Sequence, residues 1–98
     1  MGDVRLTPRA QADLFDIWTG IAAQNAGAAD RFIHRILTKA QTAANFPQMG
    51  DTRPDLSPTA RILVFGAYIA IYEPRTDGVL AVSIVHGRRD PAYWLDRS

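Results

Sequence analysis

The sequence predicts an α+β fold, in which an antiparallel helical hairpin packs on an antiparallel sheet of three or four strands. Two patterns predict this class. Residues 8–45 carry apolar side chains three and four positions apart, which is the spacing of amphipathic helices. Residues 61–85 are rich in β-branched and aromatic residues and are interrupted by turn signals, which is typical of strands. The chain has 98 residues, the length of one domain, so we expect a single unit over residues 1–98.

The beginning of the chain predicts a strand and then a helix. Val4 to Leu6 is a short strand candidate. Thr7 and Pro8 are typical of a helix start, because a threonine side chain can cap the first turn and proline at the first helical position loses no hydrogen bond. The expected apolar face is Ala10, Leu14, Ile17, Trp18 and Ile21. We expect this helix to end at Asn25 and Gly27, since both tolerate the left-handed conformation that ends a helix.

A second helix is predicted from about Ala28 to Asn45, and Pro47 prevents its continuation. Its apolar stripe is Ala29, Phe32, Ile33, Ile36, Leu37, Ala40 and Ala44, and its opposite face carries Arg31, Arg35 and Gln41. The connection between the two helices is short, which favours an antiparallel hairpin. Residues 46–60 contain three prolines and a glycine and predict an irregular loop.

The last part of the chain predicts three strands and a short tail. The strands are Arg61 to Phe65, Ala67 to Tyr72 and Val79 to Val85. Gly66 and the pair Asp77-Gly78 predict tight turns between them, so we expect an antiparallel meander. Asp90 followed by Pro91 predicts a short C-terminal helical tail.

Alternation along the strands predicts which side chains share a face. Tyr68 and Tyr72 share one face of their strand, and Ile69 and Ile71 share the other. In the last strand, His86 is expected on one face with Leu80, Val82 and Ile84. A histidine at the end of a buried strand is first interpreted as a hydrogen-bonded structural residue. Two helices can cover only one face of such a sheet, so the other face is open to solvent or to a partner.

The composition excludes several classes of site. There is no cysteine, so disulfides and thiolate chemistry are absent. No segment approaches the roughly 18 apolar residues that span a bilayer, and the start of the chain lacks a signal-peptide pattern, so we expect a soluble, cytoplasmic protein. The net charge of +1 predicts no strong nonspecific attraction to nucleic acid. Neither a cofactor nor a metal is expected, because His34 and His86 lie in different elements and Asp13 and Asp16 are interpreted as solvated.

Five segments, in the same order along the chain, resemble the ParE branch of the RelE/ParE superfamily of toxin–antitoxin toxins. They are LTPRAQADLFDIW (6–18), AADRFIHRI (28–36), FPQMGDTRPDL (46–56), GAYIAIY (66–72) and IVHGRRD (84–90). The resemblance covers nearly the whole chain and implies an antiparallel sheet packed on a helical hairpin. It further implies a bacterial toxin, of a kind found in plasmid stabilisation systems, that inhibits DNA gyrase. A ParD-like antitoxin would neutralise it in a hetero-oligomer, and DNA would be contacted only through that antitoxin.

For a gyrase inhibitor we expect binding residues and no catalytic residue. Arginines, aromatic residues and a histidine of the loop, the sheet and the C-terminal end are the candidates for contact with the target or the antitoxin. They are Arg53, Arg61, Tyr68, Tyr72, His86, Arg88, Arg89, Tyr93 and Trp94. Arg88 stands where the family usually has a small residue, so its role does not follow from the motif.

A RelE-like, ribosome-dependent mRNA endonuclease is the alternative function. Cleavage of RNA through its 2′-hydroxyl needs a base, an acid and cations. The candidates for these roles are Arg61, His86, Arg89 and Tyr93. RelE-type toxins usually carry a lysine-rich segment before the second strand, whereas this chain has one arginine between two aspartates there, which disfavours this alternative. A degenerate homologue that only binds antitoxin is a third possibility.

Overall fold

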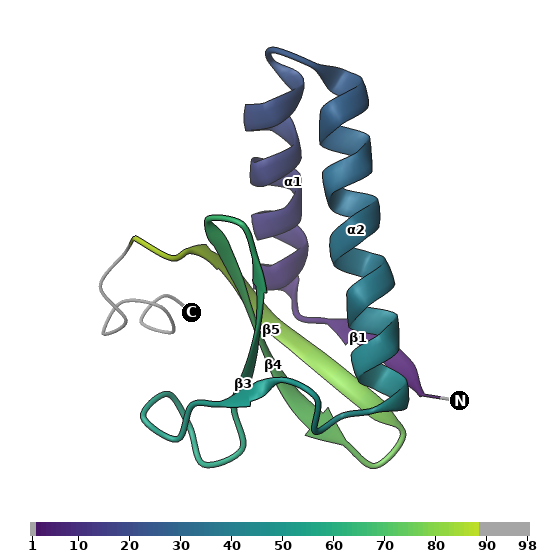
Figure 1. The fold of residues 1–98 in the computed structure, drawn as a ribbon, viewed down its shortest axis with the longest axis vertical. Coiled ribbons are helices and arrows are strands. Elements are labelled where there is room, and N and C mark those ends of the chain that lie inside the picture. The colour runs from purple at the N-terminus through teal and green to yellow at the C-terminus, as the bar shows by residue number, and fades with distance from the viewer. Residues whose placement is uncertain (1, 89–98) are drawn as a thin grey trace.

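The computed structural model describes residues 2–88, and Figure 1 shows two long helices beside a sheet. The elements are β1 (Asp3–Leu6), α1 (Pro8–Ala22), α2 (Ala26–Asn45), β2 (Asp51–Thr52), β3 (Arg61–Phe65), β4 (Tyr68–Arg75) and β5 (Gly78–His86). The predicted α+β class and element order are confirmed, with one addition: the two-residue β2 lies within the segment predicted as an irregular loop. The predicted helical tail lies outside the described residues.

The sheet is open and mixed, with the strand order β1-β5-β4-β3-β2. Strands β2 to β5 are antiparallel neighbours, as the predicted meander requires. The observed sheet has five strands, whereas the sequence predicted an antiparallel sheet of three or four. It also departs from the prediction at one edge, where β1 runs parallel to β5. The helical hairpin explains this direction, because α2 returns to the start of β1, where Asn45 Oδ1 accepts a hydrogen bond from the Gly2 N–H at 2.9 Å. Strand β3 starts from that same end, so β5, two reversals later, runs in the direction of β1.

Both helices begin at polar caps. Thr7 Oγ1 accepts a hydrogen bond from the Ala10 N–H at 3.0 Å, and α1 starts at Pro8, as predicted. Asn25 Oδ1 accepts a hydrogen bond from the Ala28 N–H at 2.9 Å, so Asn25 caps the start of α2 and does not end α1. Consequently α2 begins two residues earlier than predicted. Within residues 2–88, no helix has the length and apolar character needed to cross a membrane.

The main core lies between the helical hairpin and one face of the sheet. Tyr68 and Tyr72 share one face of β4, as predicted, and the structure shows that this face packs on the helices, whereas Ile69 and Ile71 belong to a second cluster on the opposite face. The loop of residues 46–60 covers part of that opposite face with Leu56 and Ala60. One residue of the apolar face predicted for α2 does not belong to the core, since Leu37 is 40% exposed.

A β-bulge in β5 changes which of its side chains face the helices. Val82 has no partner on β4, because Ile71 pairs with Ser83 and Tyr72 pairs with Ala81. The residues of β5 in the helix-facing core are Val79, Ala81 and Ile84. The prediction that Leu80, Val82 and Ile84 share a face is therefore wrong, since strict alternation stops at the bulge.

Candidate functional site

Two polar side chains from the start of the helical hairpin complete the edge of β5 where β1 has ended. Thr7 Oγ1 donates a hydrogen bond to the Val82 carbonyl at 2.7 Å. Asp13 Oδ2 accepts hydrogen bonds from the Ser83 hydroxyl and the Ile84 N–H, both at 2.9 Å. Because Ser83 is 0% exposed, its hydroxyl depends on this carboxylate. The interpretation of Asp13 as a solvated residue is thus wrong, and this helix-to-strand contact holds the end of β5 that leads to His86.

At the start of β3, the hydroxyl of Tyr72 holds the loop that follows α2. It donates a hydrogen bond to the Pro47 carbonyl at 2.7 Å and accepts one from the Gly50 N–H at 2.9 Å. Tyr72 is 2% exposed, and this burial raises the pKa of its hydroxyl above the ordinary value of 10.0. The hydrogen bond from Gly50 and the charge of Arg61 act in the opposite direction, with smaller effects on the pKa.

The guanidinium of Arg61 reaches the same loop from β3. Its Nη1 donates hydrogen bonds to the carbonyls of Gln48 at 2.9 Å and Gly50 at 2.7 Å. Farther along the loop, Arg53 donates from Nε and Nη2 to the two carboxylate oxygens of Asp55, at 2.9 and 2.6 Å. This forked contact holds the pKa of the Asp55 carboxyl below its ordinary value. Both arginines are therefore engaged within the chain, in contacts that shape the loop.

At the start of β4, beside the other end of β3, three aromatic rings form a row from α2 to β5. The ring centroids of Phe32 and Tyr68 lie 5.7 Å apart, and those of Tyr68 and His86 lie 5.2 Å apart in an edge-on arrangement. His86 Nδ1 accepts a hydrogen bond from the Arg88 N–H at 3.2 Å, which leaves Nε2 as the protonated nitrogen in the neutral ring. All three rings are half-buried, whereas Arg88 is exposed.

The structure divides the predicted site residues between the two ends of β3. Arg53, Arg61 and Tyr72 belong to the loop end, and Tyr68 and His86, followed by Arg88, belong to the aromatic end. The remaining candidates, Arg89, Tyr93 and Trp94, lie outside the described residues. Contact of any of these residues with a partner stays a prediction. Tyr72, which is 2% exposed, would influence a partner only through the loop that it holds.

Two basic side chains of α2, which are not among the predicted site residues, also lie at the aromatic end. The Arg35 guanidinium lies 6.0 Å from the ring centroid of Phe32, and Lys39 Nζ lies 5.7 Å from that of Phe65 on β3. Their four-residue spacing, which Arg31 extends by another turn, was the sequence signal that could have identified them.

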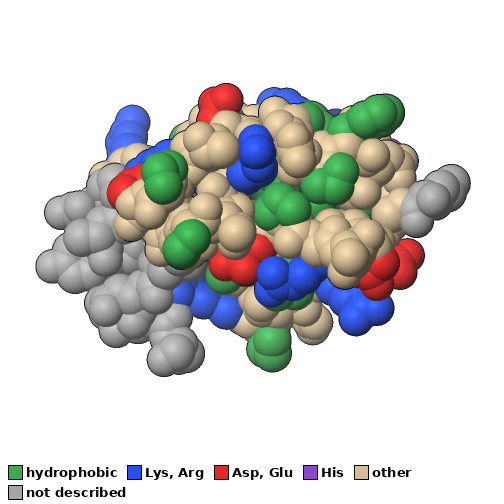
Figure 2. Space-filling model, turned by 90° about the horizontal axis from the view of Figure 1, so that it is seen from below, with side chains coloured by type: hydrophobic (Ala, Val, Ile, Leu, Met, Phe, Trp, Pro, Cys, Tyr) green, Lys and Arg blue, Asp and Glu red, His purple; other side chains and the backbone are tan. Residues whose placement is uncertain are grey.

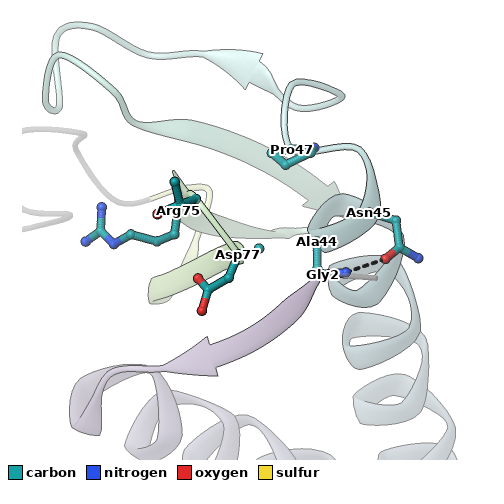
Figure 3. A pocket seen from close by; sticks show the side chains of 8 residues that line it. Gly2, Ala44, Asn45, Pro47, Arg75 and Asp77 are labelled. Atoms are coloured by element: carbon teal, nitrogen blue, oxygen red, sulfur yellow. Dashed lines mark hydrogen bonds between the residues drawn. The ribbon is translucent and has the colours of Figure 1, made fainter.

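The surface near the chain start offers a shallow hollow, shown in Figure 3, with a volume of about 430 Å³. Gly2 and Asn45 are joined across it by the hydrogen bond already described. Its charged side chains are paired with residues outside the hollow: Arg75 with Glu73 at 3.1 Å, and Asp77 with Arg5 at 3.3 Å. The hollow therefore lacks a convergent set of polar groups that would define a catalytic site.

The loop end of the molecule has a mixed surface. Figure 2 shows that basic and acidic side chains are interspersed there, with hydrophobic side chains in separate small groups. No group of three or more His, Asp or Glu side chains among residues 2–88 is arranged to hold a metal ion. Among the described residues, the predicted site side chains thus make contacts that hold the loop or pack the aromatic rings, and these contacts do not bring an acid, a base and a cation together.

Comparisons with known proteins agree with this fold. The model of a family described as "ParE toxin of type II toxin-antitoxin system, parDE" matches residues 4–91. A solved structure described as "Chromosomal ParDE TA system from P. aeruginosa" is similar, with a TM-score of 0.72 and 19% sequence identity over 88% of this chain and 96% of that chain. At this identity the structural likeness shows the fold alone. No curated protein sequence matches the chain.

Proposed function

Because the chain belongs to the ParE toxin family of type II toxin–antitoxin systems, we propose that it is a toxin that binds and inhibits DNA gyrase. In this proposal a ParD-like antitoxin neutralises the toxin by forming a hetero-oligomer with it. The proposed site of action is the cytoplasm, where gyrase acts on DNA. Contact with DNA occurs through the antitoxin, which is consistent with the toxin's net charge of only +1.

The observation that carries a binding role is the engagement of Arg61 and His86 in structural contacts. An RNA-cleaving site needs cations aimed at the phosphate and a proton-transferring group beside them. The Arg61 guanidinium instead donates to two loop carbonyls, and the His86 ring packs on Tyr68 and accepts the Arg88 N–H. Arg61 begins β3, whereas His86 lies beyond the other end of β3, across Tyr68, so the described residues supply no joined acid, base and cation. This arrangement supports inhibition by binding over hydrolysis of RNA.

The experiment that tests the proposal uses the purified full chain, purified gyrase and relaxed plasmid. We expect ATP-dependent supercoiling to fall as the toxin is titrated, and to recover when the protein encoded beside the toxin gene is added. In parallel, ribosomes translating a defined mRNA report any cleavage. Unchanged supercoiling at a large molar excess of folded toxin would argue against the proposal, and ribosome-dependent cleavage of the mRNA would assign the RelE-like activity instead.

A further inference from the structure

One flank of α2 carries a row of three exposed cations. Arg31, Arg35 and Lys39 follow one another at four-residue spacing, so they lie one above the other along two turns, over about 12 Å of helix. Lys39 lies over the Phe65 ring of β3, which places this flank toward the sheet. We call Arg31, Arg35 and Lys39 the α2 basic row.

The α2 basic row has no acidic partner among the described residues. The positions three and four residues away from each cation hold no aspartate or glutamate. The ion pairs found within residues 2–88 join arginines of β1, β4 and the loop to acids of their own surroundings, and none includes a cation of α2. The acidic residue of this helix, Asp30, accepts a hydrogen bond from the Trp18 indole at 2.8 Å. Like charges one turn apart destabilise a helix, and no acidic side chain among the described residues offsets this repulsion.

Half-buried aromatic rings lie beside the α2 basic row. The Arg35 guanidinium lies over the ring of Phe32. That ring packs on Tyr68, which in turn packs on His86. Cations next to rings that are partly open to solvent suit a ligand that combines carboxylates with apolar side chains. A peptide with both kinds of group would place its acids on the basic row and its apolar side chains on the rings.

We infer that the α2 basic row and its neighbouring rings bind an acidic segment of the antitoxin that pairs with this toxin. The inference rests on the proposed antitoxin partnership and deepens it, by naming the surface and the chemistry of the bound segment. A helical segment with glutamate or aspartate at four-residue spacing matches the row, because its carboxylates repeat at the same interval.

Two other occupants fit this surface less well. A second copy of this chain, related by a two-fold axis, would bring the same row of cations against itself and repel. A nucleic acid would extend far beyond three cations, onto a molecule whose net charge is only +1. Charge complementarity therefore favours a short acidic peptide segment over either of them.

The test compares two double variants that lose the same charge. Arg31→Gln with Arg35→Gln removes two cations from the row, and Arg5→Gln with Arg75→Gln removes two exposed cations elsewhere, one from each of two ion pairs. Glutamine is a good helix former, so α2 should be retained, and circular dichroism during heating checks this. Binding of the protein encoded beside the toxin gene is measured by calorimetry at low and at high salt.

We expect the α2 variant to weaken binding at low salt on the order of tenfold, and less at high salt, because ions screen exposed charges. The control variant should stay within about twofold of the unmodified toxin. Equal weakening in both variants, or none in the α2 variant, would overturn the inference. Gyrase inhibition is measured separately. If the α2 variant binds the antitoxin more weakly but the unmodified toxin does not inhibit gyrase, the proposed target is refuted and this inference stands.

Defined probes separate the classes of ligand. A synthetic helical peptide with glutamates at four-residue spacing, its glutamine counterpart and a single-stranded oligonucleotide are each titrated with the folded toxin. We expect the glutamate peptide to bind more tightly than the glutamine peptide and to lose that advantage with the α2 variant. If the oligonucleotide binds more tightly than the glutamate peptide, and only when the α2 basic row is intact, the surface is a nucleic-acid site and the inference fails.

Discussion

Replacing Tyr72 with phenylalanine removes one hydroxyl and, with it, two hydrogen bonds that hold the loop after α2. The Pro47 carbonyl loses a donor at 2.7 Å and the Gly50 N–H loses an acceptor at 2.9 Å. Gly50 is buried, so its N–H has no access to replacement water, and an unsatisfied buried group costs about 1–3 kcal/mol. We therefore expect Tyr72→Phe to lower the free energy of unfolding by about 2 kcal/mol, which corresponds to a fall in Tm of roughly 8–16 °C for a domain of this size.

Urea denaturation followed by circular dichroism measures this loss. The matched control is Tyr68→Phe on the same strand and the same face, because the Tyr68 hydroxyl makes no hydrogen bond with the described residues. We expect the control to change stability by less than about 0.5 kcal/mol. If both substitutions cost the same, the hydroxyl of Tyr72 does not hold the loop and the reasoning is refuted.

The pH dependence gives an independent check on the same residue. Burial raises the pKa of Tyr72 in the folded chain above its ordinary value of 10.0, so the unfolded chain loses the proton first. The contribution to stability is therefore complete below about pH 10 and is lost as the pH rises through the folded pKa. We expect the stability difference between the unmodified chain and Tyr72→Phe to shrink above pH 10. A difference that grows with pH would contradict the assignment.

Four further substitutions, two at side-chain contacts and two at glycines, are each followed by urea denaturation. Asp13→Ala leaves a fully buried hydroxyl and a backbone N–H of β5 without their acceptor, and we expect a loss of about 2 kcal/mol; a loss below about 0.5 kcal/mol would mean that the carboxylate is solvated after all. Arg61→Ala removes the donor to two loop carbonyls, and we expect the free energy of unfolding to fall by about 1 kcal/mol. No fall would mean that these hydrogen bonds do not stabilise the loop and that the arginine is available for contact with a partner. Gly66→Ala should destabilise the chain by about 1 kcal/mol, because the φ of +59° disfavours a side chain although there is space for one. Gly20→Ala in α1, also in open space, should stabilise by a similar amount, because alanine favours a helix. Effects of the same sign would contradict the argument that backbone conformation decides both.

The features that the sequence predicted are those that depend on local chemistry. Thr7 and Pro8 identify the start of α1, and the Asp77-Gly78 pair identifies a hairpin turn, because caps and turns are set by neighbouring residues. The features that it missed depend on distant contacts. The bulge at Val82 and the parallel pairing of β1 arise where separate parts of the chain meet, and neither leaves a periodic pattern in its own segment. Asp13 was misinterpreted for the same reason, since its partners lie 70 and 71 residues away.

The candidate site was predicted less completely than the fold, because residue type does not show how a side chain is used. Arg61 and Tyr72 were selected as groups that could touch a partner, and the structure shows both holding one loop. His86 was selected as either a catalyst or a structural residue, and its contacts with Tyr68 and Arg88 agree with the structural interpretation. The cations of α2 were overlooked, because exposed arginines on a helix normally need no explanation.

The motifs that carry the family resemblance are largely committed to the fold, and this bears on how the target is chosen. At Gly50 an added Cβ would come within 2.7 Å of the Ile62 carbonyl oxygen and of the Tyr72 ring and hydroxyl, so only glycine fits against that side chain. Gly66, at positive φ, makes the turn that leads into the strand bearing Tyr72. Motif residues of this kind specify the fold, and because one fold can carry different activities, they do not choose between the proposed gyrase inhibition and the alternative RNA cleavage. In the proposed function, discrimination between antitoxins resides in exposed side chains that the core does not constrain, and the α2 basic row is such a set among the described residues.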